Sequence, residues 1–218
     1  MRFTLILALL PALSVVLADD DMDSPMGSKE FVPTWEFEPF PGEKVVLNGT
    51  IEQVVAELKQ INPDYSPFSS DSLAQADASF LSSTVQLPEI YPRDKVLCNM
   101  PKWGFVDTYS SDRGYSHLLG VRGRPRGDPG PGNCGRVSCG YKAAVWFCND
   151  APEDHVLSRA DGFLVQNKRH IVLDNFQEIA HMVGFIKYYC SANSPSKFNG
   201  QAFHQTGNWN VVLRRASC

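Results

Sequence analysis

The chain has 218 residues, of which 43% are hydrophobic and 20% are charged, and its formal net charge is −4. The charges are divided unevenly. Residues 19–95 carry 15 acidic and 5 basic side chains, whereas residues 98–218 carry 9 acidic and 14 basic ones. The basic excess of the second part is too small and too dispersed to indicate nucleic-acid binding. The unequal division indicates either attraction between the two parts or a solvated acidic tail.

Residues 1–18 have the features of a secretory signal peptide. Arg2 provides the basic start, residues 3–17 are largely apolar, and the small residue Ala18 suits the cleavage site. A membrane anchor is the alternative, but it needs about 20 apolar residues, and this run is shorter and contains Pro11. We therefore expect a soluble, secreted, extracellular protein without stable membrane insertion.

Residues 19–95 are predicted to be an acidic leader and linker. Residues 19–47 are acidic and Pro-rich with little periodicity, which is typical of extended or disordered chain. Residues 64–95 are rich in Ser, Asp and Pro and are predicted to be the linker. Part of the leader is nevertheless expected to lie on the rest of the protein, because it contains four apolar aromatic side chains: Phe31, Trp35, Phe37 and Phe40.

One helix is predicted within the leader, at about residues 50–61. Thr50 and Gln53 have the spacing of a capping box, and Asn62-Pro63 ends the helix. Its apolar residues fall on one face: Ile51, Val54, Val55, Leu58 and Ile61. Asn48 begins an acceptor sequence for N-glycosylation, so we expect it in an exposed loop next to the helix start.

All six cysteines lie after residue 97. An even number in an exported chain predicts three disulfides, although the spacing leaves their connectivity open. A zinc site is the alternative, but the chain has no CxxC pair and its five histidines are scattered. Residues 129–150 hold three cysteines and an apolar run at 143–147 that is typical of a central strand. We interpret them as the scaffold of a domain that spans residues 96–218.

Further elements of this domain are predicted from periodicity and turn signals. We expect a strand at 95–99, a helix at about 110–121, a hairpin with Asp161-Gly162 at its turn, a helix at about 174–190, and strands at 201–204 and 209–214. The helix at about 174–190 has a clear apolar stripe formed by Phe176, Ile179, Val183 and Ile186.

Two segments are candidates for a binding surface. The loop at 122–128 alternates Gly and Pro with Arg122, Arg124 and Arg126, and it is either a basic contact loop or a solvated connector. The hairpin at 155–169 combines apolar residues with a basic rim, and it is either a binding tip or a small satellite core. Its candidate residues are Leu157, Arg159, Phe163, Leu164, Lys168 and Arg169. Lys168-Arg169 also matches a dibasic processing site, although an uncut exposed turn is the simpler interpretation.

Enzyme signatures are largely absent. The chain contains no GxSxG, HExxH or Walker motif. His181 and Glu178 lie one helical turn apart, but such a pair on a lone helix face is usually an ordinary surface pair. We therefore predict a protein that is not an enzyme and that needs no cofactor or metal.

Three segments together resemble a class of small secreted fungal proteins that includes the killer-toxin-like proteins and related necrosis-inducing effectors. They are PGNCGRVSCGYKAAVWFCND, the helix that ends in Cys190, and GQAFHQTGNWNVVLRRASC. The resemblance covers Cys98 to Cys218, and LNGTIEQVVAELKQINPDY is similar to the leader of some members. It implies an α+β fold, an α/β sandwich in which two helices pack on one face of an antiparallel sheet. It also implies three disulfides: Cys139–Cys218, Cys98–Cys190 and Cys134–Cys148.

This resemblance implies a virulence-type effector that binds a host extracellular protein, and we expect it to act as a monomer. One specific form is inhibition of a host papain-like cysteine protease, since a disulfide-stapled body with exposed loops avoids the ordering cost of binding. The alternatives are a killer-type toxin acting on membranes or ion channels, and a secreted hydrolase or ribonuclease. Fewer cysteines, the long leader and the inserted hairpin at 151–172 distinguish the chain from the killer toxins.

Overall fold

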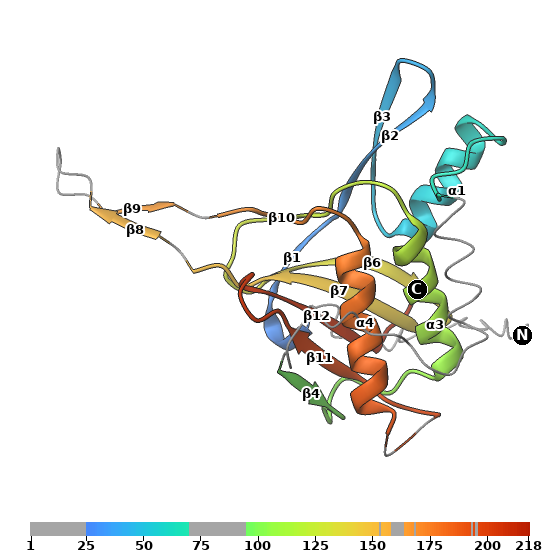
Figure 1. The fold of residues 1–218 in the computed structure, drawn as a ribbon. Helices are drawn as coiled ribbons and strands as arrows, with labels where there is room; N and C mark the ends of the chain where they lie inside the picture. Colours follow the sequence, from blue (N-terminus) through green and yellow to red (C-terminus); the bar gives the residue numbers. More distant parts are fainter. Residues whose placement is uncertain are drawn as a thin grey trace, which may run out of the picture.

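The computed structural model describes residues 25–69, 95–152, 154–157, 164–167, 169–192, 194 and 196–218. The predicted signal peptide, the start of the leader and most of the predicted linker lie outside these residues. The described part contains a central six-stranded sheet, three α-helices and three disulfides (Figure 1). The broad α+β class predicted from the sequence is therefore confirmed.

The central sheet consists of β1 (Lys29–Phe31), β4 (Val96–Cys98), β6 (Asn133–Gly140), β7 (Ala143–Asn149), β11 (Gly200–Phe203) and β12 (Trp209–Arg215). Their order is β1–β6–β7–β12–β11–β4. All neighbours are antiparallel except β1 and β6, which are parallel. The expectation of a purely antiparallel sheet is therefore wrong at this edge. A tight hairpin between two strands would force them to be antiparallel. No such hairpin joins β1 to β6, so these strands can pair in parallel.

Strand β7 lies inside the sheet and is buried along its whole length. Successive residues of a strand point to opposite faces, so its side chains enter two separate clusters. Val145 and Phe147 belong to the main core, whereas Trp146 and Cys148 belong to a smaller cluster on the other side. We call these two sides of the sheet the helix face and the second face.

Helices α3 (Thr108–Gly120) and α4 (Gln177–Cys190) pack against each other and cover the helix face (Figure 1). Helix α3 contacts β6 and β7, and α4 contacts β4, β11 and β12. The predicted pair of helices on one face is thus present. Among the described residues, no helix is both long enough and apolar enough to cross a membrane.

Two predicted helix starts differ from the structure. Helix α3 begins earlier than predicted because the Asp107 side chain accepts the Ser110 N–H at 2.8 Å and caps the first turn. Helix α4 begins at Gln177 rather than at Asp174. Asp174 does not cap it, and its own N–H donates instead to the Glu178 carboxylate at 2.9 Å. The predicted apolar stripe of this helix is buried.

Part of the leader, predicted to be either extended or disordered, folds as a β-hairpin of two extended strands. Strands β2 (Thr34–Phe40) and β3 (Glu43–Asn48) are antiparallel. Trp35 is 3% exposed and stacks on Phe176, with the ring centroids 4.3 Å apart. The alternation of aromatic and acidic residues from Trp35 to Glu38 is typical of a strand with one buried face, but Pro39 within β2 and the acidic composition of the leader obscure it.

Helix α1 (Ile51–Ile61) follows this hairpin and has the predicted bounds. Gln53 accepts the Thr50 N–H at 2.9 Å, as a capping box requires. Val54 and Leu58 are fully buried in the main core, together with residues of α3, α4 and the sheet. The helix is therefore docked on the cysteine-rich part of the chain.

A 3-10 helix, η1 (Pro25–Gly27), and two short ladders complete the described elements. Strand β5 (Arg126–Gly127) pairs with β10 (Ile171–Val172). Strand β8 (Asp154–Leu157) pairs with β9 (Leu164–Asn167), so the backbone of the predicted hairpin is present. Its predicted turn lies outside the described residues.

The three disulfides are Cys98–Cys190, Cys134–Cys148 and Cys139–Cys218. These are the pairs that the resemblance implies. The first joins β4 to the end of α4, the second joins neighbouring strands β6 and β7, and the third ties the C-terminus to β6.

The crosslinks are expected to differ in their contribution to stability. Cys98–Cys190 closes a sequence separation of 92 residues and Cys134–Cys148 one of 14. In the chain-entropy model these contribute about 4–5 and about 3 kcal/mol, respectively. Denaturant unfolding of the two double Cys→Ala variants should show the larger loss for Cys98/Cys190. An equal or reversed order would contradict this account.

Replacing Leu58 by Asp should destabilise the whole protein, because a charge would enter the main core. The loss should reach or exceed the roughly 2–5 kcal/mol that truncation of a buried leucine costs. Ala56→Asp, on the exposed side of the same helix, is the control and should cost below about 1 kcal/mol. An unchanged melting temperature of the Leu58→Asp protein would mean that α1 is not docked in solution.

Candidate functional site

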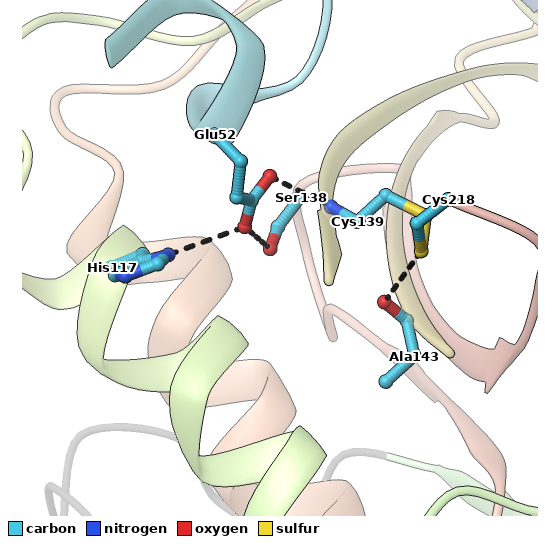
Figure 2. A network of polar contacts seen from close by, with 6 residues as sticks. All are labelled: Glu52, His117, Ser138, Cys139, Ala143 and Cys218. Atoms are coloured by element: carbon cyan, nitrogen blue, oxygen red, sulfur yellow. Dashed lines mark hydrogen bonds and ion pairs between the residues drawn. A yellow bond between two sulfur atoms is a disulfide. The ribbon is translucent and has the colours of Figure 1, made fainter. Parts of the chain in front are cut away.

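A partly buried carboxylate joins α1 to the rest of the protein. Figure 2 shows Glu52 pointing from the first turn of α1 toward α3 and β6. Ser138 Oγ donates to Glu52 Oε1 at 2.6 Å, and the Cys139 N–H donates to Oε2 at 2.8 Å. His117 Nδ1 lies 3.2 Å from Oε1. One carboxylate thus connects three elements.

Hydrogen bonding keeps this carboxylate ionised. Burial alone would raise the pKa of Glu52, but the hydrogen bonds from His117, Ser138 and Cys139 outweigh it and lower the pKa below the ordinary value. The sequence prediction missed Glu52 and His117 as a contact pair. The one available signal was an acidic residue beside the apolar face of an amphipathic helix.

The side chains of Glu52, His117 and Ser138 do not form a nucleophilic triad. In such a triad, histidine accepts the serine proton and the carboxylate orients the histidine. Here Ser138 donates directly to Glu52 and is only 1% exposed. Its neighbour Cys139 is bonded to Cys218. The arrangement anchors a helix, and it presents no serine nucleophile to solvent.

Other candidate chemistry is also weak. Burial lowers the pKa of His181. Glu178 instead accepts the backbone N–H of Asp174. The two residues therefore lie in different local environments. Residues 130–135 match the pattern GxGxxG, but they lead into an antiparallel strand and not into the strand–turn–helix that binds a dinucleotide. Within the described residues, no group of three His, Cys, Asp or Glu side chains could hold a metal ion.

The arginine loop is exposed at all three predicted positions. Arg124 Nη2 lies 3.2 Å from Asp174 Oδ1, and Arg124 Nε donates to the Leu173 carbonyl at 3.3 Å. Arg126 Nε donates to His170 Nδ1 at 3.4 Å. Both members of the Arg124–Asp174 pair are largely exposed, so this ion pair contributes little to stability.

Two of these arginines line a groove of about 640 Å³ that the leader helps to form. Phe176 and Trp35 are part of its lining, and Val32 and Val46 add side chains that are 65% and 59% exposed. We call this site the arginine groove, and its lining residues include Val32, Trp35, Val46, Arg124, Arg126 and Phe176. The sequence prediction identified the arginines but not their apolar neighbours, because these come from the leader. Arg122 is not part of the lining.

The predicted hairpin surface stays a prediction. The backbones of Leu157 and Leu164 are paired across β8 and β9, but their side chains lie outside the described part of the chain, as do Arg159, Phe163 and Lys168. Arg169 is described and exposed. Asn48, the expected glycan acceptor, is exposed at the end of β3, and its side-chain oxygen accepts the Thr34 hydroxyl at 3.1 Å.

The Glu52 contacts predict a pH-dependent contribution to stability. A carboxyl with a lowered pKa in the folded state stabilises above its ordinary pKa of about 4.5, and this stabilisation is lost as the pH falls through the folded-state value. Glu52→Gln should therefore cost about 1.5–3 kcal/mol at pH 7, and the difference from wild type should shrink toward pH 3. Denaturant unfolding across this range measures it, with the exposed Glu57→Gln as control. A difference that is independent of pH would contradict the assignment.

No family model, no curated protein and no solved structure matches this chain. The resemblance to the killer-toxin-like proteins therefore remains an expectation from the quoted segments.

Proposed function

We propose that this protein is a secreted effector of the killer-toxin-like class that binds a host extracellular protein through the arginine groove. The observation that carries the proposal is the composition of this groove. Val32 and Val46 are exposed and line the same groove as Arg124 and Arg126. Arginine is enriched among the residues that contribute most of the affinity in protein interfaces, and the exposed valines add apolar surface to the same groove.

The groove belongs to a rigid part of the molecule. Trp35 stacks on Phe176, and the Trp35 indole N–H donates to the Gly49 carbonyl at 2.8 Å. These contacts fix β2 against the start of α4. A preformed groove loses little conformational entropy on binding, which favours a tight complex.

The groove is lined by Arg124 and Arg126 and also by the carboxylates of Glu36 and Asp128. Lys44 Nζ lies 2.6 Å from Glu36 Oε1 and compensates its charge. The two arginines suit a carboxylate of a partner segment, and the exposed valines suit its apolar side chains. Asp174 is a weak, exposed partner of Arg124, so a carboxylate of the bound protein can replace it. A host papain-like cysteine protease is the specific partner we propose. The effector would occupy the protease cleft through this surface, with the hairpin at 155–169 as a second contact.

Charge insertion into the groove tests the proposal. The Val32→Asp/Val46→Asp protein should inhibit papain at least about tenfold less strongly than wild type, because two apolar anchors become like-charged with the partner. Its melting curve should stay unchanged because both residues are exposed. Tyr188→Asp is the matched control, since Tyr188 is also 59% exposed but lies on α4.

The inhibition assay also distinguishes the arginine groove from the hairpin at 155–169 as the contact surface. A Phe163→Ala/Leu164→Ala protein that alone loses inhibition would assign binding to the hairpin and not to the groove. Capture from host extracellular fluid, followed by protease-activity profiling, identifies the partner if papain is not inhibited. Capture of the same partner by the groove variant and by wild type would exclude the groove.

A further inference from the structure

A second hollow lies on the second face of the sheet. This polar pocket has a volume of about 390 Å³, which is within the range of small-ligand sites. The Cys134–Cys148 disulfide lies in its lining, and its polar side chains include Lys29, Asp150, Gln201 and Asn210. It shares no lining residue with the arginine groove, so a ligand bound here would be independent of the proposed function.

The polar side chains form a chain of hydrogen bonds with a defined direction. Asn210 Nδ2 donates to Asp150 Oδ2. An ionised carboxylate only accepts hydrogen bonds, so Asn210 must turn its amino group toward Asp150 and its oxygen away. Gln201 Nε2 donates to that oxygen at 2.9 Å. The Asp150 carboxylate therefore also determines the orientation of the Gln201 amide.

This orientation leaves Gln201 Oε1 without a donor. Gln201 is 7% exposed, and its side-chain oxygen is buried without a hydrogen-bond partner in the structure. Buried acceptors are almost always paired in native proteins. Gln201 lines the polar pocket, but its oxygen has less than 1 Å² of accessible surface, so a molecule in the pocket can supply the missing donor once the Gln201 side chain shifts slightly toward it. One water molecule takes up only about 30 Å³, far less than the pocket holds.

The charges of the pocket favour a neutral ligand. Lys29 and Asp150 contribute one positive and one negative group, and Lys29 would repel an ammonium ion. Burial raises the pKa of Asp150, although hydrogen bonds from Asn210 and the Gly132 N–H oppose this effect. A further donor would stabilise its carboxylate. The disulfide and Pro131 add apolar surface that suits the C–H face of a sugar ring.

We propose that the polar pocket binds a saccharide unit. One hydroxyl donates to Gln201 Oε1, a neighbouring hydroxyl donates to the Asp150 carboxylate, and Lys29 donates to a ligand oxygen. Hydroxyl groups suit this site because each both donates and accepts, and the lining offers carboxylate and amide acceptors together with one ammonium donor.

Ligand-observed NMR on the full chain tests the proposal with four separate probes: D-glucose, D-mannose, D-xylose and N-acetyl-D-glucosamine. At least one should bind with a Kd on the order of 1 mM. Asp150→Asn keeps the shape of the side chain and Gln201→Leu removes the unpaired acceptor, and each should weaken binding about tenfold or more. Lys29→Met changes an exposed residue, so it tests the site even if a buried variant fails to fold. Arg124→Ala, in the arginine groove, should bind like wild type.

Three results would overturn the proposal. The first is the absence of saturable binding for all four sugars. The second is binding of ethylamine or acetate in their place, which would indicate a site for a charged ligand. The third is sugar binding that Lys29→Met and the folded Asp150 or Gln201 variants leave unchanged, since it would have to occur elsewhere on the protein.

Discussion

Burial of strand β7 on both faces is the constraint on which the rest of the structure depends. A strand with one solvated face needs apolar residues only at alternate positions, whereas β7 is buried at every position. Helices α3 and α4 cover one face. Among the described residues, the other face is covered by a smaller cluster that includes Trp103, both cysteines of the Cys134–Cys148 disulfide and Cys139. Crosslinks there supplement a small core, as is usual in small exported domains.

The leader belongs to the same core as the cysteine-rich part. Trp35 reaches the start of α4, Leu58 enters the main cluster, and Glu52 connects α1 to α3 and β6. The arginine groove exists only because these contacts bring β2 and β3 next to the loop that carries Arg124 and Arg126. Docking of the leader and formation of the groove are therefore one event, and a change that releases α1 would also disrupt the proposed binding surface.

The two hollows differ in chemistry because they lie in different parts of the sandwich. The arginine groove lies where the leader hairpin meets the edge of the main core, so apolar side chains remain exposed beside a basic loop. The polar pocket lies on the second face, where the 3-10 helix Pro25–Gly27 forms part of its lining, and there the strands carry amides in place of apolar residues. An extended apolar and acidic segment suits the first site, and a neutral polyhydroxyl ligand suits the second.

Several features follow from the sequence alone: the helix at 51–61, the buried strand at 143–147, the exposed arginine loop and the apolar stripe of α4. Each depends on a periodicity or turn signal within a few neighbouring residues. Such a signal reflects the local backbone geometry directly. Only the tertiary structure decided the parallel pairing of β1 with β6, the grouping of Glu52 with Ser138, and the unpaired Gln201 oxygen. Glu52 and Ser138 are 86 residues apart, and their contact depends on how the strands and helices pack. No local pattern specifies that packing, because many arrangements of the same elements bury the same apolar faces.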